Sequence, residues 1–498
     1  MTKRRTMLSN ARLGSRIAED EVENLHAYFV ETEQWRKVLS GEVDIIFGSK
    51  GAGKSALYSL LVGKKEELRL GRRTMFIAAE NPRGTPAFSG LTTTPPLPED
   101  AFRGLWKLYF LTLAANYLRF QVTATKTVNK NANDVIKVLT DCDLLPENVN
   151  LRARLKMAYE YLYQYIPHIE GTIKDSNTGL ELKGKITLGE PNKEQRGLGF
   201  RSLDSLLLQI NESLQEQKIT CWMVLDRLDV AFIDSPELES NALRALFRTY
   251  LDMIALSNIK VKIFLRDDIW KRIVEGGFRE ASHITKTLNL TWDKQSLMNL
   301  IVKRIASNVD ICDYYGFEHA NLMSDATLQR NFFYKLFPKQ VDVGERQPET
   351  FDWMMSRTAD GSKRTAPREL IHLLLATRDE QLTRYQVGNA GPYDDRLFDN
   401  VAIRAAMPAV SLARYNQTLC AEYPAFKVNL DALEGEKTQQ TIRSLSRLWG
   451  CSHSKAEDIS EKLFEVGFFE RRGTKDSPTY WVPFLYRDAL LMVQGSAE

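Results

Sequence analysis

The chain has 498 residues, of which 43% are hydrophobic and 26% are charged. That composition is typical of a globular protein and excludes a collagenous, low-complexity or wholly disordered chain. Since 67 Lys and Arg residues stand against 64 Asp and Glu residues, the formal net charge of +3 gives no argument for nucleic acid or membrane as a partner. The length predicts about three domains at roughly 150 residues each.

We expect no membrane span, secretory signal or disulfide framework. The most apolar stretch, 105–120, contains Lys107 and Asn116, whereas a spanning helix needs about 20 mainly apolar residues. No apolar segment follows the basic N-terminus, so no signal peptide is predicted. The five cysteines are scattered without a CxxC pair, which is typical of reduced thiols. These features predict a cytoplasmic protein with no membrane contact and no metal held by protein side chains alone.

Residues 1–40 are predicted to form a basic arm followed by a helix. Residues 1–16 contain five Lys or Arg residues and no acid. Such a run fits a phosphate-binding arm or, more commonly, a solvated terminus. From 17 to 39, apolar residues at helical spacing, among them Leu25, Phe29 and Trp35, predict a helix that stops before Gly41.

Residues 41–290 carry the signals of an α/β core with an insertion at 82–200. Apolar strands alternate with helices, which predicts a doubly wound parallel sheet. The expected strands are 43–47, 74–78, 220–225, 261–265 and 288–290, and the expected helices are 56–62, 203–214 and 243–256. Within the insertion we expect an irregular connection at 82–100, two or three helices across 101–166 and a hairpin at 171–190.

The rest of the chain is predicted to form a helical lid and a C-terminal domain. The lid spans 291–388, and a linker at 389–392 follows it. Within 393–498, helices at 438–449 and 455–466 precede a strand pair at 468–470 and 479–482. This order is typical of a winged helix-turn-helix domain.

The strongest motif is a glycine loop placed between a strand and a helix, as its function requires. Glycines at 48, 51 and 53 allow the backbone to wrap around phosphate at the N-terminus of the next helix. In such a loop the Lys54 ammonium contacts the β- and γ-phosphates, and the Ser55 hydroxyl is a ligand of Mg²⁺. The expected phosphate-binding residues are Gly48, Lys50, Gly51, Ala52, Gly53, Lys54, Ser55 and Ala56.

A second signal is an acidic motif after the apolar strand 220–225. A phosphate loop of this kind needs a carboxylate from a neighbouring strand to complete the shell of Mg²⁺. Asp226 stands where the strand ends, and Asp229 follows three residues later. Alone, the two acids fit a surface turn equally well. Together with the glycine loop they indicate a Mg²⁺–nucleotide site.

These motifs resemble those of the AAA+ and STAND P-loop ATPases, and in particular bacterial relatives of origin-recognition initiators and KAP-like proteins. The resemblance covers about 41–80, 200–310 and 355–385. It implies ATP and Mg²⁺ as cofactors, with Arg266 or Asp267 at the sensor 1 position. It also implies that Arg368 is the sensor 2 arginine that reaches the γ-phosphate. The insertion 82–200 matches no family.

One residue departs from the family pattern. AAA+ proteins place a glutamate directly after the strand aspartate to polarise the attacking water, and this chain has Arg227 there. A guanidinium cannot act as a base, so Asp229 is the obvious substitute. The departure predicts slow hydrolysis or a nucleotide-gated switch.

The sequence leaves several kinds of binding partner open: a neighbouring subunit, DNA or another protein. Oligomeric relatives supply an arginine finger in trans, and four arginines lie in the matching region: Arg244, Arg248, Arg272 and Arg279. The second C-terminal helix is acidic on balance while the strand pair is basic, so DNA binding and protein docking both stay open.

Three function classes therefore remain. The first is an oligomerising switch that signals to an effector protein, as in bacterial antiphage defence. The others are a DNA-dependent motor or remodeller and a DNA-binding regulator. We favour the switch.

Overall fold

The structure of the chain is a computed structural model. It describes residues 3–17, 20–21, 25–63, 73–79, 98–125, 129–147, 149–163, 186–228, 236–388, 391–392, 394–474 and 477–497. Contacts divide the chain into two compact units, 1–32 with 50–53 and 291–498, and 33–49 with 54–290. No helix in the described ranges combines the length and the apolar composition that crossing a membrane requires.

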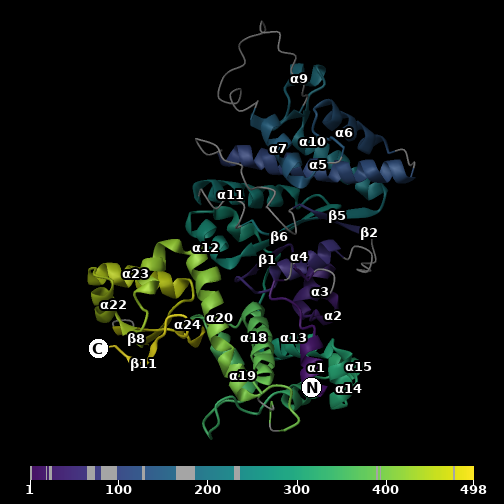
Figure 1. The fold of residues 1–498 in the computed structure, drawn as a ribbon. Coiled ribbons are helices and arrows are strands. Elements are labelled where there is room, and N and C mark those ends of the chain that lie inside the picture. The colour runs from purple at the N-terminus through teal and green to yellow at the C-terminus, as the bar shows by residue number, and fades with distance from the viewer. Residues whose placement is uncertain are drawn as a thin grey trace. The chain divides into compact units, whose positions relative to one another are not determined.

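The second unit contains a five-stranded sheet (Figure 1). Its strands are β1 (Ile45–Gly48), β2 (Arg73–Ala78), β5 (Ile219–Leu225), β6 (Ile259–Arg266) and β7 (Thr287–Asn289). They are all parallel and lie in the order β2-β5-β6-β1-β7. β5 and β6 are almost wholly buried, as apolar strands covered on both faces should be. The predicted parallel α/β fold is confirmed.

Helices flank this sheet and build the insertion. They are α3 (Glu33–Ser40), α4 (Lys54–Gly63), α5 (Glu99–Thr125), α6 (Lys130–Asp141), α7 (Leu151–Tyr163), α9 (Lys193–Gly197), α10 (Leu203–Glu216), α11 (Pro236–Met253), α12 (Asp267–Glu275) and the 3₁₀-helix η2 (Arg279–His283). The helices expected across 101–166 are thus α5, α6 and α7. Of the hairpin expected at 171–190, only 186–190 is described. There the short β3 (Ile186–Thr187) pairs in parallel with β4 (Arg201–Ser202).

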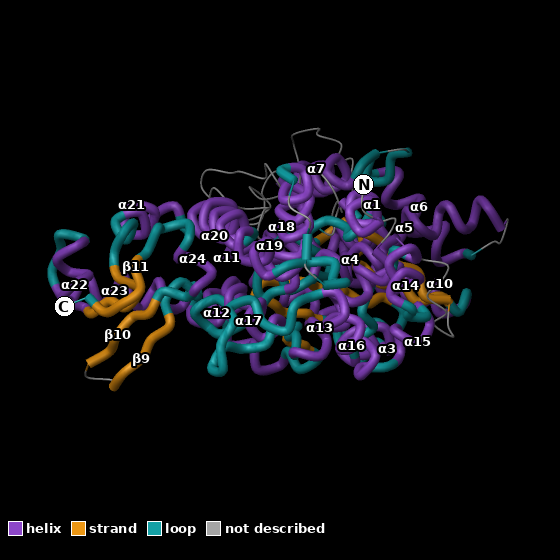
Figure 2. Tube along the Cα trace, turned by 60° about the horizontal axis from the view of Figure 1, so that its bottom comes forward, coloured by secondary structure: helices purple, strands orange, loops and turns teal. Residues whose placement is uncertain are grey.

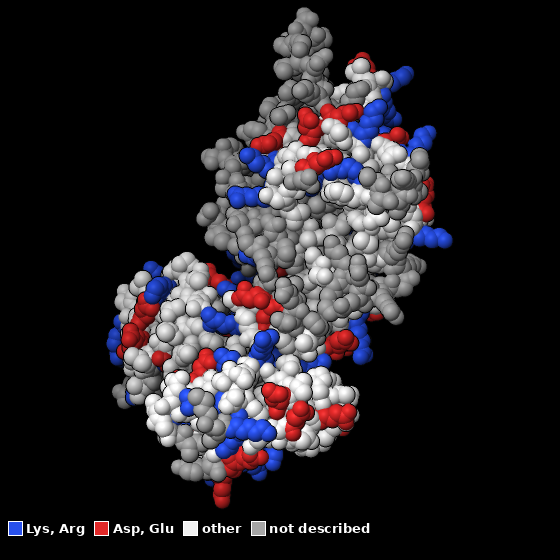
Figure 3. Space-filling view, turned by 45° about the vertical axis from the view of Figure 1, so that its right-hand side comes forward, with Lys and Arg blue, Asp and Glu red and all other residues white. Residues whose placement is uncertain are grey.

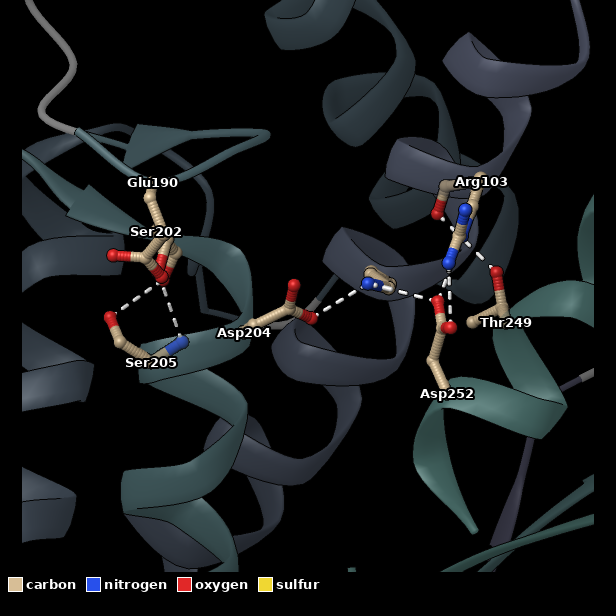
Figure 4. Close-up of polar contacts among 8 residues, drawn as sticks. Arg103, Glu190, Ser202, Asp204, Ser205, Thr249 and Asp252 are labelled. Atoms are coloured by element: carbon tan, nitrogen blue, oxygen red, sulfur yellow. Dashed lines mark hydrogen bonds and ion pairs between the residues drawn. The ribbon is translucent and has the colours of Figure 1, made fainter. Parts of the chain in front are cut away.

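A polar network joins α5 to its neighbouring helices (Figure 4). The Arg103 guanidinium donates two hydrogen bonds to Asp252 on α11, at 2.8 and 2.6 Å. Lys107 lies 2.7 Å from Asp204 on α10 and 3.0 Å from Asp252. Burial alone would raise the pKa of Asp252, but hydrogen bonds from the two cations outweigh it and hold that pKa below its usual value. The network therefore ties α5 to both α10 and α11.

One cation in the insertion is buried without an acid. Arg154 on α7 is 4% exposed, its Nη1 has no hydrogen-bond partner, and it forms no ion pair within the described ranges. Burial lowers its pKa, and the charge of Arg119 lowers it further despite an opposing contribution from Tyr109. A buried charge of this kind costs stability because nothing replaces its hydration.

Arg154→Met is therefore expected to stabilise the protein by about 1–3 kcal/mol. The measurement is the midpoint of thermal unfolding of the full chain. The matched control is Arg119→Met, which removes hydrogen bonds to the carbonyls of Leu145 and Pro146 and should lower the midpoint. A fall in the midpoint for Arg154→Met would contradict this account.

The first unit is mainly helical. Its helices are α1 (Lys3–Asn10), α2 (Leu25–Tyr28), α13 (Lys294–Ala306), α14 (Val309–Tyr315), α15 (His319–Ser324), α16 (Ala326–Leu336), α17 (Thr350–Thr358), α18 (Pro367–Gln386), α19 (Asn400–Ala405), α20 (Met407–Arg414), the π-helix η3 (Tyr415–Cys420), the 3₁₀-helix η4 (Pro424–Phe426) and α21 (Lys427–Asp431). The solvated N-terminal arm is a wrong prediction, because α1 buries Met7 and Leu8 in the core of this unit. The single helix expected at 17–39 is also wrong, because α2 and α3 are separate.

The C-terminal part of this unit holds a four-stranded sheet in the order β11-β8-β10-β9. Its elements are β8 (Lys437–Thr441), α22 (Ile442–Leu448), α23 (His453–Glu465), β9 (Glu470–Thr474), β10 (Ser477–Trp481), α24 (Phe484–Arg487) and β11 (Val493–Ser496). Figure 2 shows the β9–β10 hairpin projecting beside α22 and α23. The segment 438–449 was predicted to be one helix, but its first residues belong to β8. The helix α22 starts only at Ile442, because Thr441 and Ser444 form a capping box there.

A backbone contact joins the turn before α18 to the turn after α23. The Gly361 N–H donates to the Gly467 carbonyl at 2.7 Å. A Cβ on Gly361 would lie 2.2 Å from the Phe469 carbonyl oxygen, so only glycine fits. An ion pair of 3.1 Å between Lys363 and Glu470 lies beside it.

Candidate functional site

The glycine loop lies between β1, which ends at Gly48, and α4, which begins at Lys54. Gly51 and Gly53 have φ of 82° and 100°, conformations that glycine adopts at little cost. The first N–H groups of α4, which include those of Ser55 and Ala56, have no partner within the helix. The loop thus combines tight backbone turns with a helix N-terminus, the arrangement that binds phosphate.

The Lys54 side chain lies against its own loop. Its Nζ donates to the carbonyls of Gly48 at 2.6 Å and Ser49 at 2.9 Å. These bonds hold a positive charge at the point where the chain leaves the strand.

The centre of the loop, residues 50–53, packs within the first unit. Ala52 is 3% exposed, and its carbonyl accepts a hydrogen bond of 2.8 Å from Trp292 Nε1. A Cβ on Gly53 would lie 3.8 Å from the Trp292 ring. The sequence analysis missed Trp292, since a lone tryptophan before a helix has no motif around it.

Arg368 lies beside the same part of the loop. It stands in the first turn of α18, and a Cβ on Gly51 would approach its Cβ to 3.1 Å. The structure therefore brings together the second loop glycine and the arginine that the sequence singled out in the lid. The next residue, Glu369, is 4% exposed, and its Oε2 would lie 3.4 Å from that Cβ without a hydrogen-bond partner of its own.

Two further acid–base pairs surround this contact. Lys50 of the loop forms an ion pair with Glu422, which follows η3. Arg414 at the end of α20 lies 2.8 Å from Glu369. Burial alone would lower the pKa of Arg414, but Tyr486 and Glu369 raise it above its ordinary value. Glu369 directly follows the arginine that the sequence singled out but was given no role there, and Glu422 belongs to no motif.

Asp226 stands at the carboxyl end of β5 and is 3% exposed. From the sequence, its strand β5 was expected to be the direct neighbour of β1. In the structure β6 lies between the two strands. The two strands still end at the same edge of the sheet, since all are parallel. Arg227 has φ of 59°, which is costly for a residue with a Cβ. Asp229 lies outside the described residues.

The sheet register places Arg266 beside the loop. Gly48 of β1 and Arg266 of β6 are paired residues. The Arg266 guanidinium is bound in bidentate fashion by Asp268, at 2.9 and 2.7 Å. Asp267 is the first residue of α12. Both sensor 1 candidates therefore lie at the carboxyl edge of the sheet.

Three of the four arginine-finger candidates are engaged within the chain. Arg248 lies 2.6 Å from Glu99 and 3.0 Å from Glu280, and Arg272 lies 3.1 Å from Glu239. Arg244 donates to the Gly276 carbonyl at 2.6 Å. Arg279 is exposed and has no such partner in the described part of the chain.

The residues present fit a magnesium–nucleotide complex. A Cβ at Gly51 would crowd Arg368, and the positive φ at both loop glycines keeps the loop closely turned. Hydroxyl and carboxylate oxygens, as at Ser55 and Asp226, are the hard ligands that Mg²⁺ prefers. The loop amides and Lys54 supply the donors that phosphate oxygens need.

Comparisons with known proteins add little. No family model and no curated protein matches the chain. Among solved structures, it is similar to the ORC2 protein of Aeropyrum pernix, solved as ADPNP–ADP complexes. That likeness covers 98% of this chain and 96% of the other at 13% identity, with a TM-score of 0.41. A likeness at this identity and TM-score assigns the chain to no family. The proposed function therefore rests on the residues of the site.

Proposed function

We propose that the protein is a Mg²⁺-dependent ATP-binding P-loop ATPase of the AAA+/STAND type, which hydrolyses slowly and works as an oligomerising switch. The observation that carries the proposal is the glycine loop between a buried parallel strand and a helix, with Asp226 buried at the same edge of the sheet. The loop amides and Lys54 would bind the phosphates, and Ser55 and Asp226 would hold Mg²⁺. The metal, when bound, neutralises phosphate charge.

Slow turnover is supported by the residue after Asp226. Arg227 offers no base for the attacking water and occupies a strained backbone conformation. Arg368, adjacent to Gly51, would contact the γ-phosphate, and Arg279 is the best placed arginine for a neighbouring subunit's site because it is exposed. Adenine as the base, an effector protein as the partner and a role in antiphage defence rest on the family resemblance.

The alternatives that act on DNA are less well supported. Three basic side chains of the second helix and the hairpin are paired with acids: Arg471 with Glu461, Arg472 with Glu470 and Lys462 with Asp458. On the face drawn in Figure 3, Lys and Arg are interspersed with Asp and Glu among the described residues. A surface that binds the DNA backbone would concentrate positive charge.

The test measures three quantities on the full chain, with and without DNA: affinity for a non-hydrolysable ATP analogue, the rate of phosphate release, and the mass distribution. We expect Mg²⁺-dependent binding, turnover below the usual 1–10³ s⁻¹ and nucleotide-dependent assembly, all indifferent to DNA. Turnover stimulated by DNA would favour the motor. Salt-sensitive DNA binding that ignores nucleotide would favour the regulator.

The contacts of the loop suggest how the switch is biased. Carboxylates of Glu369 and Glu422 lie next to Gly51 and Lys50, where an incoming triphosphate meets like charge. Glu422→Gln is therefore expected to tighten nucleotide binding by about two- to fivefold, the scale of a partly exposed ion pair. Calorimetric titration measures it. Glu434→Gln, an exposed acid elsewhere in the C-terminal part, should leave the affinity unchanged, and a weaker affinity in Glu422→Gln would count against this bias.

A further inference from the structure

An open recess lies in the second unit, at the edge of the sheet opposite the carboxyl end of β1. Its lining residues are Asp44, Tyr250, Met253, Ile254, Ile259, Lys260, Val261 and Lys286. They come from the starts of β1, β6 and β7 and from the end of α11. The glycine loop follows the carboxyl end of β1, so the recess is a separate place on the molecule.

A buried ion pair lies beside the recess and shares Asp44 with its lining. Lys262, 1% exposed, lies 2.7 Å from Asp44 and 4.1 Å from the centre of the Trp222 ring. The Tyr250 hydroxyl donates to the other oxygen of Asp44 at 3.1 Å. The Asp44 carboxylate is therefore already paired with the Lys262 ammonium and accepts a hydrogen bond from the Tyr250 hydroxyl.

Two more lysines stand at the recess, and among the described residues neither has an ion-pair partner other than Asp44. Lys260 is two residues before Lys262 on β6 and so points to the same face of the sheet. One of its three N–H donors is used by the Leu256 carbonyl at 2.9 Å. Lys286 lies 3.8 Å from Asp44, beyond hydrogen-bonding distance. Three lysines thus face one aspartate, an excess of two positive charges among the described residues.

This excess is held at a partly desolvated position. Burial lowers the pKa of Lys260; Asp44 raises it in part and the charge of Lys286 lowers it again. An anion between the two ammonium groups would relieve the repulsion and use their remaining donors.

We propose that Lys260 and Lys286 form a binding site for a phosphate group at the amino-terminal edge of the sheet. Phosphate carries a charge of about −1.5 to −2 at neutral pH, which matches the local excess better than a carboxylate does. Met253, Ile254 and Val261 form apolar walls of the recess beside the two lysines.

The experiment uses the full chain carrying Lys54→Ala, so that phosphate binding at the glycine loop does not contribute. Inorganic phosphate is titrated calorimetrically, and AMP against adenosine is the second arm. We expect saturable, single-site phosphate binding. Each of Lys260→Gln and Lys286→Gln should weaken it by about 10- to 100-fold, as the loss of a charge-assisted hydrogen bond predicts. Lys271→Gln, an exposed lysine of α12, is the control and should bind normally.

A second measurement does not depend on the variants. In the chain with native Lys260 and Lys286, saturating phosphate should protect both from acetylation, mapped by mass spectrometry, and leave Lys271 reactive. Binding of AMP but not adenosine identifies the phosphate group of a larger molecule as a ligand, and binding of inorganic phosphate alone identifies the free ion. Loss of all phosphate binding in the Lys54→Ala background, or equal binding by the lysine variants without protection, would overturn the site. Neither result bears on ATP binding by the wild-type chain.

Discussion

Lys54→Ala is expected to weaken ATP binding by about 100-fold, or about 2.7 kcal/mol. The Lys54 ammonium is held at the loop by the carbonyls of Gly48 and Ser49, where it would contact the phosphates. Alanine keeps the α4 helix, because its helix propensity is high. Titration with a non-hydrolysable analogue in the presence of Mg²⁺ measures the loss.

Two controls make this result specific. Lys271→Ala removes an exposed lysine from the same unit and should bind ATP normally. The unfolding midpoint of Lys54→Ala without nucleotide should stay near that of the wild type, whereas the rise in midpoint on adding ATP should disappear. ATP binding as tight as in the wild type would remove the basis for the proposed function.

Asp44→Ala is expected to destabilise the protein by about 3–5 kcal/mol. It leaves Lys262, 1% exposed, without its carboxylate and removes the acceptor of the Tyr250 hydroxyl. Urea unfolding followed by tryptophan fluorescence measures the loss, since Trp222 packs directly on the lysine.

The same variant should also show a stronger pH dependence of its stability than the wild type. Burial lowers the pKa of Lys262 in the folded chain, and Asp44 opposes this. Without Asp44, the folded state binds that proton less tightly than the unfolded state, so stability should rise with pH from neutral toward the lysine pKa of about 10.4. The double variant Asp44→Leu with Lys262→Met should lose less stability than Asp44→Ala. A single variant within 1 kcal/mol of the wild type would show that the pair contributes little.

The core of the fold could be predicted because its signals are local. The segments 220–225 and 261–265 are short and mainly apolar, as buried strands are, and the glycine loop required a strand before it and a helix after it. The order of the strands in the sheet could not be predicted from local signals. No residue within 220–226 indicates that β6 lies between β5 and β1. The basic residues around Met7 and Leu8 led to the prediction of a solvated arm. The burial of Met7 and Leu8 could not be predicted locally, because it depends on partners in helices far along the chain.

The candidate site was predictable in its motifs and not in its surroundings. Lys54 and Asp226 belong to recognisable strings. Trp292 and Glu422 contact the loop from positions far along the chain, and their neighbours in sequence carry no pattern that would mark them. Glu369 follows the predicted Arg368, but nothing in the sequence indicated that its carboxylate approaches Gly51. β8 escaped prediction for a related reason, because Thr438, Gln439 and Gln440 form a polar strand whose pairing partners are remote.

The backbone bond between Gly361 and Gly467 has a mechanical consequence. It links the turn that leads into α18 to the turn that follows α23, and the close approach at Phe469 leaves no room for slippage. If α18 rotates when Arg368 binds or releases a phosphate, the four-stranded sheet near the C-terminus is expected to move together with α18. The position of the β9–β10 hairpin would then depend on which ligand occupies the loop.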